Sequence, residues 1–415
     1  MRVLWFTGGI SNYQKGIHGY NGCGWITALE TELQKQKEVQ LGIAFFLNGQ
    51  PEKVECERHL YYPIANPYRS SIIGRLRYVL TSPNKRQDFF IQAYLRVIDD
   101  FQPDIIHIFG TEQDFGLIAL HIHVPIVIHI QGLLTPYLTS FFPPGYTLCK
   151  YVMSDYQPWK MFRRWRRYVY FKKNTEVEKL IFRCNRHFMG RTQWDRNLTS
   201  IYSPQATYDY CGEILRDAFY ESSVRKLSDR LIIVTTISSM IYKGFDMVLK
   251  CAKLMKEQMR LDFEWRVYGD VDPRAAEKRE KICAEDVNIE LMGIASPNEL
   301  RCSITESTLY VHPSYIENSP NSVCEAQMLG CTVVAQNVGG MSSIVAHGET
   351  GILVPANDPY QMACAIRDLY NDPVRNEEMG HRAAEIAHQR HDKERIVADL
   401  LGIYKRYMIE KTKNE

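Results

Sequence analysis

The sequence lacks several features that mark special classes of protein. It has no run of about 18 apolar residues, so we expect no transmembrane helix. Its 11 cysteines are scattered and none forms a CxxC pair, which argues against a disulfide framework and a structural zinc site. The short apolar stretch before Thr7 is not long enough for a signal peptide. These absences together predict a cytoplasmic protein.

The sequence also lacks an excess of either charge. Lys plus Arg number 50 and Asp plus Glu number 48, which gives a net charge of +2. Proteins that bind nucleic acid usually carry a larger basic excess, so we expect no nucleic-acid partner. With 45% hydrophobic and 24% charged residues, the composition is that of a folded globular protein, and 415 residues fit two sizeable domains.

Short apolar runs alternate with segments of helical spacing along most of the chain. Such runs are typical of strands buried on both faces of a parallel sheet. The alternation predicts an α/β protein made of two doubly wound halves, with the boundary between them somewhere in 205–229. The expected strands are 2–6, 104–109, 125–130, 230–236, 263–268, 289–292, 309–312, 332–336 and 351–354.

The stretch 312–358 contains the residues that best fit a chemical role. Glu317 and Glu325 are separated by seven residues, and a helix is expected to begin between them, near 320–322, with Ser319 or Asn321 as its cap. The free amides of such a helix start bind anions. Glu325, about one turn inside, can accept hydrogen bonds from a ribose diol, and Glu317 can reach hydroxyls of a group carried by the phosphate. The alternative is two solvated surface acids.

This stretch resembles the signature of retaining glycosyltransferases of family 4. These enzymes have the GT-B fold, in which two Rossmann-like doubly wound domains face each other across a cleft. The resemblance rests on the motif of the acidic pair, with the Ala and Gly that follow it, and on three further segments. The matching residues are Glu317, Glu325, Ala326, Gly330, Gly339-Gly340, the Gly351–Pro355 strand and the Tyr242-Lys243-Gly244 segment.

The resemblance implies an activity and a domain plan. The protein would move a sugar from a nucleotide diphosphate-sugar to an acceptor hydroxyl with retention, in polysaccharide, lipopolysaccharide or glycolipid biosynthesis. Attack would come from the front face, and the departing phosphate would help to remove the acceptor's proton. Residues 1–220 would bind the acceptor and 221–389 the nucleotide-sugar, while a last helix, 390–415, would pack back on the first domain.

The resemblance also implies roles for individual residues. Glu325 would hold the ribose, Glu317 and His129 would face the donor sugar, and Lys243 would contact the diphosphate. His129 ends an apolar run just before Gln131-Gly132, at the sheet edge where ligands of doubly wound proteins bind. The other residues expected around the donor are Gly22 and Gly24 in the first glycine loop, Ser319, Asn321, Ser322 and Val323 at the helix start, and Gly269 after the strand 263–268.

One position departs from the family pattern. Many members carry an arginine five residues before the lysine, and here that position is Ser238. Either Lys243 and the amides suffice for the diphosphate, or a cation comes from elsewhere. Arg191 is the candidate, with a surface salt bridge as the alternative. We expect no metal and no other cofactor, because no acidic or histidine cluster has metal-binding spacing and helix amides with a lysine can neutralise the leaving group.

A basic and aromatic stretch, 159–173, interrupts the first half with seven cations in 160–173. It predicts either a solvated helix with an aromatic inner face or a peripheral contact with anionic lipid on the inner face of the membrane, which would suit a lipid-linked acceptor. Two other functions stay open. One is a GT-B nucleotide-sugar epimerase or hydrolase, and the other is a non-catalytic protein that binds a sugar nucleotide or a membrane.

Overall fold

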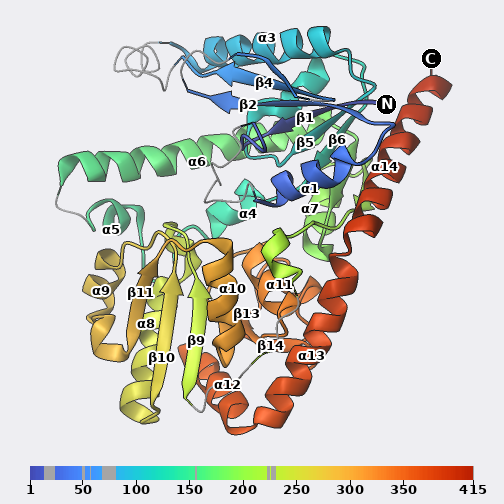
Figure 1. Cartoon of the computed structure of the whole chain (residues 1–415). Helices are drawn as coiled ribbons and strands as arrows, with labels where there is room; N and C mark the ends of the chain where they lie inside the picture. Colours follow the sequence, from blue (N-terminus) through green and yellow to red (C-terminus); the bar gives the residue numbers. More distant parts are fainter. Residues whose placement is uncertain are drawn as a thin grey trace.

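The computed structural model has two α/β domains, one above the other in Figure 1. It describes residues 1–13, 24–48, 52–56, 58–67, 81–154, 157–221, 225 and 230–414. Each domain is built on one sheet, with helices on both of its faces. The predicted class, two Rossmann-like doubly wound domains, is therefore confirmed.

The N-terminal domain is built on an eight-stranded sheet of order β3-β4-β2-β1-β5-β6-β7-β8. All neighbouring strands are parallel except β3 and β4, which form an antiparallel edge. The strands are β1 (Arg2–Thr7), β2 (Gln40–Leu47), β3 (Val54–Cys56), β4 (His59–Ala65), β5 (Ile105–Phe109), β6 (Ile126–His129), β7 (His187–Gly190) and β8 (Thr207–Tyr210). The helices are α1 (Gly24–Gln34), α3 (Pro83–Phe101), α4 (Leu134–Thr139), α5 (Leu148–Val152), α6 (Pro158–Cys184) and α7 (Gln193–Tyr202).

The C-terminal domain is built on a six-stranded parallel sheet of order β11-β10-β9-β12-β13-β14. Its strands are β9 (Leu231–Thr236), β10 (Phe263–Tyr268), β11 (Ile289–Gly293), β12 (Leu309–His312), β13 (Val333–Gln336) and β14 (Gly351–Val354). Its helices are α8 (Phe245–Lys253), α9 (Arg274–Glu280), α10 (Pro297–Glu306), α11 (Asn321–Met328), α12 (Pro359–Asn371) and α13 (Pro373–Arg390).

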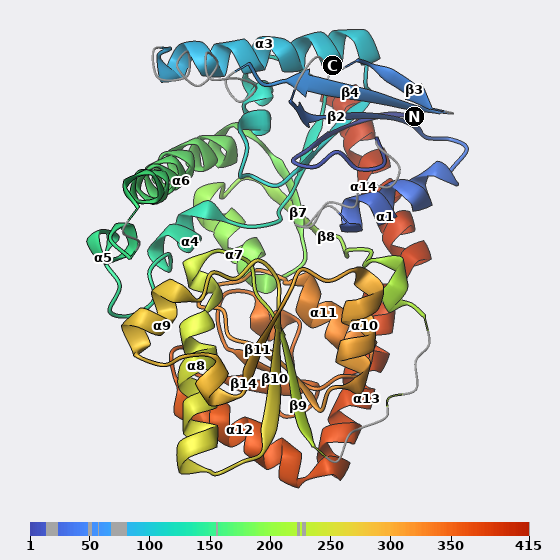
Figure 2. The same ribbon diagram turned by 60° about the vertical axis from the view of Figure 1, so that its left-hand side comes forward.

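The last helix, α14 (Lys393–Asn414), runs back from the C-terminal domain along the N-terminal one (Figures 1 and 2). Its Leu400, Tyr404 and Tyr407 are buried in the core cluster that contains the strands of the first sheet. The Tyr404 hydroxyl lies 2.6 Å from Nδ1 of His107 and accepts a hydrogen bond from the Trp5 indole. The chain thus crosses between the domains twice.

The order of the second sheet creates a switch point between β9 and β12. From β9 the chain proceeds outward to β10 and β11, and then returns to the other side of β9 to form β12. In doubly wound sheets the loops at such a point diverge and leave a crevice at the carboxyl ends of the strands, where ligands bind. The loop after β9 contains Lys243, and the loop after β12 contains Glu317.

Candidate active site

Lys243 and Glu317 meet at this switch point. The Lys243 ammonium lies 2.5 Å from Oε1 of Glu317, and Nε2 of His312, the last residue of β12, lies 3.2 Å from the same oxygen. Burial alone would raise the pKa of Glu317, but the charge of Lys243 and the contact with His312 outweigh it and lower this pKa to about 2. The carboxylate is therefore charged and held in place by two side chains.

Two glycines let the loops of the switch point approach each other. Gly244, directly after Lys243, has φ +80°, and a Cβ there would lie 2.0 Å from the carbonyl oxygen of Pro313. Gly339 has φ +53°, and its Cβ would lie 1.9 Å from the carbonyl oxygen of Glu317. Only glycine has neither the Cβ nor the penalty for positive φ, so these two positions fix where Lys243 and Glu317 stand.

Glu325 lies on α11 and is almost fully buried. Its two oxygens accept hydrogen bonds from Nε and Nη2 of Arg216, at 2.6 Å and 2.7 Å. Burial raises the pKa of Glu325, and the guanidinium of Arg216 opposes that rise. Arg216 belongs to the segment that connects the two domains, and nothing in the sequence indicated it as a partner of Glu325.

The helix α11 begins at Asn321, as the sequence predicted, but its cap differs. Pro320 is the residue at the N-cap position and no side chain caps the helix. The prediction that Ser319 or Asn321 caps it is therefore wrong. The amides of Val323 and Cys324 are instead bonded to the Pro320 carbonyl. Ser319 is buried, and its hydroxyl lies 3.9 Å from the thiol of Cys324, while Ser322 is half-buried beside Tyr310.

Asn318, the residue after Glu317, connects the two domains. Its side-chain oxygen accepts a hydrogen bond from Thr192 at 2.6 Å, and its side-chain nitrogen donates to the carbonyl of Gln131 and to Asp195, both at 3.0 Å. Its backbone amide donates to the Tyr137 hydroxyl at 3.1 Å. All four partners belong to the N-terminal domain, so Asn318 ties that domain to the loop that holds Glu317.

The structure gives His129 and Arg191 other surroundings than those expected. His129 is enclosed between Trp25, His107 and Arg191, and burial followed by the charge of Arg191 lowers its pKa to about 3. Arg191 is itself buried and forms an ion pair with Glu213. Its guanidinium therefore has an acidic partner inside the N-terminal domain, and its replacement of the cation missing at Ser238 stays a prediction.

The glycines expected near the donor fall in different parts of the structure. Gly22 lies outside the described residues. Gly24 is the first residue of α1, and a Cβ there would lie 2.9 Å from Cγ and Cδ of Arg216. Gly269 follows β10 with φ +121°, and its amide donates to the carbonyl of Gly293 at 2.7 Å. Gly24 therefore lies against the side chain of Arg216, which in turn holds the Glu325 carboxylate. Gly269 lies at the end of β10, the strand beside β9.

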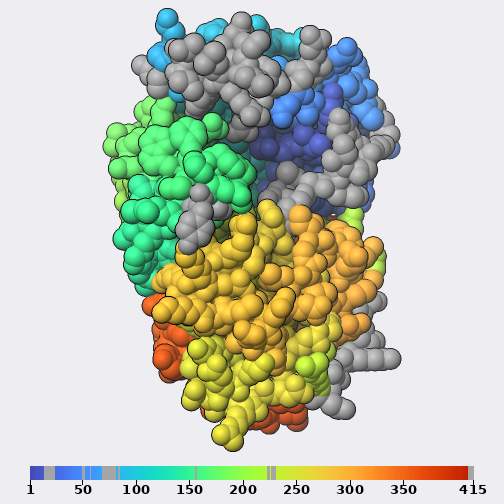
Figure 3. Space-filling model, turned by 90° about the vertical axis from the view of Figure 1, so that its left-hand side faces the viewer, coloured from blue at the N-terminus to red at the C-terminus, as the bar shows by residue number. Residues whose placement is uncertain are grey.

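A cavity of about 520 Å³ lies between the domains beside Ser238. Arg163, Arg164 and Arg167 of α6 line it from the N-terminal domain, opposite the loops after β9 and β10. Figure 3 shows the side of the molecule on which α5 and α6, in green, meet the yellow part of the C-terminal domain. The basic stretch is thus neither wholly solvated nor wholly free to meet a membrane, because three of its arginines face the other domain.

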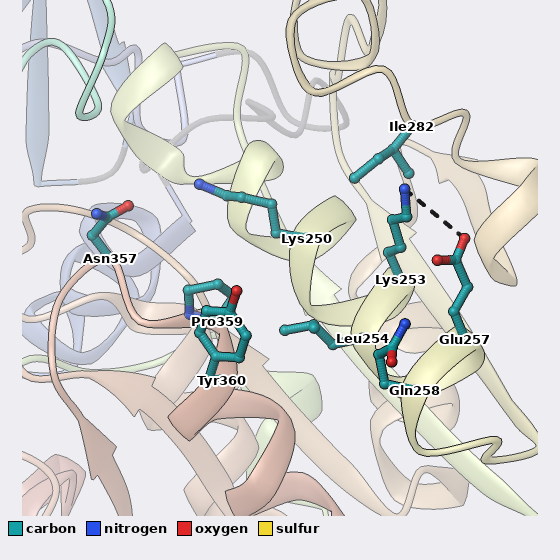
Figure 4. Close-up of a pocket in the computed structure, with 9 residues that line it drawn as sticks. All are labelled: Lys250, Lys253, Leu254, Glu257, Gln258, Ile282, Asn357, Pro359 and Tyr360. Carbon is teal, nitrogen blue, oxygen red and sulfur yellow. Dashed lines mark ion pairs between the residues drawn. The ribbon is translucent and has the colours of Figure 1, made fainter.

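A second cavity, of about 360 Å³, lies within the C-terminal domain between α8 and the start of α12 (Figure 4). It is bordered by a π-helical turn, Leu254–Gln258, which continues α8. Two lysines on its wall are already paired, Lys253 with Glu257 at 3.9 Å and Lys250 with Asp246 at 3.1 Å. We therefore do not assign it a ligand.

Part of the chain matches a known protein family. Residues 229–372 match the family described as glycosyl transferases group 1. The D-inositol 3-phosphate glycosyltransferase of Pseudarthrobacter chlorophenolicus is 32% identical over 167 residues, which are 39% of each chain. The chain thus aligns with about two fifths of the length of this curated relative. The C-terminal domain thus matches the group 1 glycosyltransferases, which confirms the resemblance inferred from residues 312–358.

Solved structures show the fold over the whole chain. Sucrose-phosphate synthase from Thermosynechococcus elongatus superposes with a TM-score of 0.75 at 15% identity, over 99% of both chains. The Anabaena protein HepE, in a complex with UDP and glucose, superposes with a TM-score of 0.65 at 15% identity, over 98% of this chain and 100% of the other. The protein therefore has the GT-B fold from end to end.

Sequence reasoning missed four residues of this site. His312 had a signal, because it ends a strand five residues before Glu317. Arg216, Asn318 and Tyr137 had none, because their partners are 109 or more residues away along the chain. Gln131 was noted only as a neighbour of His129, although it is Gln131 whose carbonyl reaches the other domain.

Proposed function

We propose that the protein transfers a sugar from a nucleotide diphosphate-sugar to an acceptor hydroxyl, with retention at the anomeric carbon, in the synthesis of a glycan or glycolipid. The observation that carries the proposal is the position of the Lys243–Glu317 pair at the switch point, in a domain whose sequence matches group 1 glycosyltransferases. Lys243 supplies positive charge for the leaving diphosphate, and Glu317 is a fixed acceptor for hydroxyls of the donor sugar.

The first experiment is a binding panel of UDP, GDP and ADP and their sugars, read by thermal unfolding. A ligand at 100 times its dissociation constant adds about 2.7 kcal/mol of stability. The ligand that stabilises is then offered as donor with D-inositol 3-phosphate, the compound named in the relatives, and with a set of glycans and glycolipids. Release of free sugar or of an epimer without any acceptor would favour the epimerase or hydrolase, and binding without turnover would favour a non-catalytic protein.

Glu325→Ala is expected to weaken nucleotide binding by about 1.5–3 kcal/mol, because the ribose hydroxyls lose a charged acceptor. Isothermal titration with the nucleotide identified above measures this loss. Glu306→Ala is the matched control, since this glutamate lies on the same domain but is largely exposed and contacts Arg266 at 3.7 Å. Equal affinities for the two variants would remove Glu325 from the site.

Activity is expected to persist in excess EDTA. Among the residues that the structure describes, no group of three or more His, Cys, Asp and Glu side chains is placed to hold a metal ion. In the proposed reaction, Lys243 and the positive end of the α11 helix dipole would supply positive charge instead. Turnover is measured before and after EDTA. Loss of activity that magnesium or manganese restores would refute the proposed metal-independent reaction.

We also propose that the outer face of α6 contacts anionic membranes. In the described part of the chain, no helix meets the length and hydropathy needed to span a bilayer. The outer face of α6 nevertheless exposes a row of large apolar side chains beside cations, the pattern of helices that lie in a lipid interface. These side chains are Trp159, Phe162, Trp165, Val169 and Tyr170, beside Arg166, Lys172 and Lys173.

The membrane test must spare the arginines that line the interdomain cavity. We expect the wild type to sediment with vesicles that contain anionic lipid and to be released from them by salt. It should not bind neutral vesicles. Replacement of Phe162 and Trp165 by serine together with Arg166 and Lys172 by glutamine should abolish this binding and leave nucleotide affinity unchanged. Tyr360→Ser, a change of an exposed aromatic side chain on α12, is the control. A wild type that stays in the supernatant at low salt contradicts the proposal.

A further inference from the structure

The pair of Arg216 and Glu325 conflicts with the role expected of Glu325. Both carboxylate oxygens are engaged by the guanidinium in a bidentate arrangement, at 2.6 Å and 2.7 Å, and Glu325 is 2% exposed. Bidentate pairs between arginine and a carboxylate are among the strongest side-chain hydrogen bonds. A ribose diol needs the same oxygens, so a nucleotide can bind Glu325 only if Arg216 gives up at least part of this pair.

Arg216 is also the longer and more exposed member of the pair. Its side chain is 30% exposed, whereas that of Glu325 is fixed inside the domain. Its guanidinium stacks 4.8 Å above the ring of Phe219, and its methylene groups fill the space that a side chain at Gly24 would need. Arg216 thus stands between the first turn of α1 and α11, where the N-terminal and C-terminal domains face each other.

Two cations expected at the donor site are already engaged in ion pairs. Arg191 is paired with Glu213 and Lys243 with Glu317, while three arginines of α6 line the interdomain cavity beside Ser238. A diphosphate brings two or more negative charges into a partly dehydrated cleft, where each added cation has a large effect. Arg216 has the geometry of a phosphate ligand, because its planar fork binds phosphate and carboxylate oxygens in the same bidentate way.

We propose that Arg216 is a mobile cation of the donor site, which exchanges Glu325 for the diphosphate when a nucleoside diphosphate binds. The ribose hydroxyls take over the oxygens of Glu325, and the freed guanidinium turns to the phosphate groups. This inference rests on the proposed function, because it assumes a nucleotide donor at Glu325. No covalent bond is made or broken in this exchange, because one set of hydrogen bonds replaces another.

This exchange makes the site selective for the diphosphate. A nucleoside without phosphates has to displace Arg216 from Glu325 and has no negative group to bind the guanidinium, so its affinity is lowered. A nucleoside diphosphate replaces the lost pair, because its phosphates bind Arg216. Removal of the Arg216 side chain should therefore lower the affinity for the diphosphate and raise the affinity for the nucleoside.

The test compares a nucleoside with its diphosphate on the Arg216→Ala variant by isothermal titration. The probes are uridine with UDP, guanosine with GDP and adenosine with ADP, and the pair whose diphosphate binds the wild type is used. We expect the diphosphate to bind about 10-fold more weakly to the variant, as for the loss of one charged hydrogen-bond partner, and the nucleoside to bind several-fold more tightly. Arg216→Lys, which keeps the charge without the fork, should recover most of the affinity for the diphosphate.

Arg301→Ala is the matched control, because Arg301 is also partly exposed and paired, with Glu221 at 3.2 Å, but lies on α10. It should change neither affinity. Equal weakening of both ligands in Arg216→Ala, or no change in either, overturns the inference and leaves Arg216 a purely structural partner of Glu325. If Arg216→Ala does not fold, the same comparison on Arg216→Lys decides, since a tighter nucleoside is still expected there. A wild type that binds none of the diphosphates overturns the proposed function itself.

Discussion

Replacement of Gly339 by alanine is expected to be among the most damaging single-methyl changes in this protein. Gly339 has φ +53°, and a Cβ there would lie 1.9 Å from the carbonyl oxygen of Glu317 and 3.0 Å from its carbon. The amide of Gly340 also donates to that oxygen at 2.9 Å, so the two loops cannot separate without losing a hydrogen bond. The Glu317 loop must therefore move, and its side chain with it.

The expected size follows from the two effects combined. Positive φ costs an alanine about 1 kcal/mol, and an overpacked contact adds about 1–3 kcal/mol, so we expect a loss of about 2–4 kcal/mol in the free energy of unfolding. Transfer activity should fall by about 100-fold, as for a displacement of about 1 Å in a catalytic group. Urea unfolding and an assay of nucleotide release measure the two effects.

Gly348 offers a matched control within the same domain. It also has a positive φ, +81°, but a Cβ there would have nothing within 4 Å. Gly348→Ala should therefore show only the backbone cost of about 1 kcal/mol and keep full activity. If Gly339→Ala and Gly348→Ala behave alike in both measurements, the close approach to Glu317 does not control the site.

Strands that are apolar and end at a glycine or at a marked loop were predictable from the sequence. The predicted strands 263–268, 309–312 and 351–354 coincide with β10, β12 and β14. Strands of the first half without such signals were missed. The short β7 and β8 have only four residues each, and β4 contains Pro63, a residue that argues against a strand inside a sheet. Fold class therefore followed from the pattern, and the complete sheet order did not.

The residues of the candidate site also fall into two groups, those that the sequence indicated and those that it did not. The spacing of Glu317 and Glu325 indicated that they flank the start of one helix, with Glu317 in the preceding loop and Glu325 about one turn inside. Asn318 could not be recognised, since its partners Gln131 and Asp195 are 187 and 123 residues away. The exchange partner of Glu325 was hidden for the same reason. Only a fold that brings both domains together shows which side chains complete the site.

Lys243→Met is expected to lower both the stability of the protein and its affinity for the nucleoside diphosphate. The change removes the cation proposed for the diphosphate and leaves the buried carboxylate of Glu317 with His312 as its one remaining partner among the described residues. Breaking a buried pair on one side costs about 3–5 kcal/mol, more than the pair itself contributes. We therefore expect lower stability in urea and weaker binding of the nucleoside diphosphate. The double variant Lys243→Met with Glu317→Gln should be more stable than Lys243→Met alone, because no unpaired charge remains. A double variant as unstable as the sum of the two single changes would show that the pair is not coupled.

The pH dependence of the free energy of unfolding tests the pair of Lys243 and Glu317 independently. The pKa of Glu317 is about 2 in the folded protein and near 4.5 when unfolded, because Lys243 and His312 outweigh the cost of burial. A carboxyl with a lowered pKa contributes its full stability above pH 4.5 and loses it as the pH falls toward 2. The wild type should therefore lose about 2 kcal/mol by pH 3 that Glu317→Gln does not lose. Urea unfolding of both proteins at pH 6, 5, 4 and 3 measures the difference, and a constant gap between them across this range would mean that Lys243 does not hold Glu317 in its charged form.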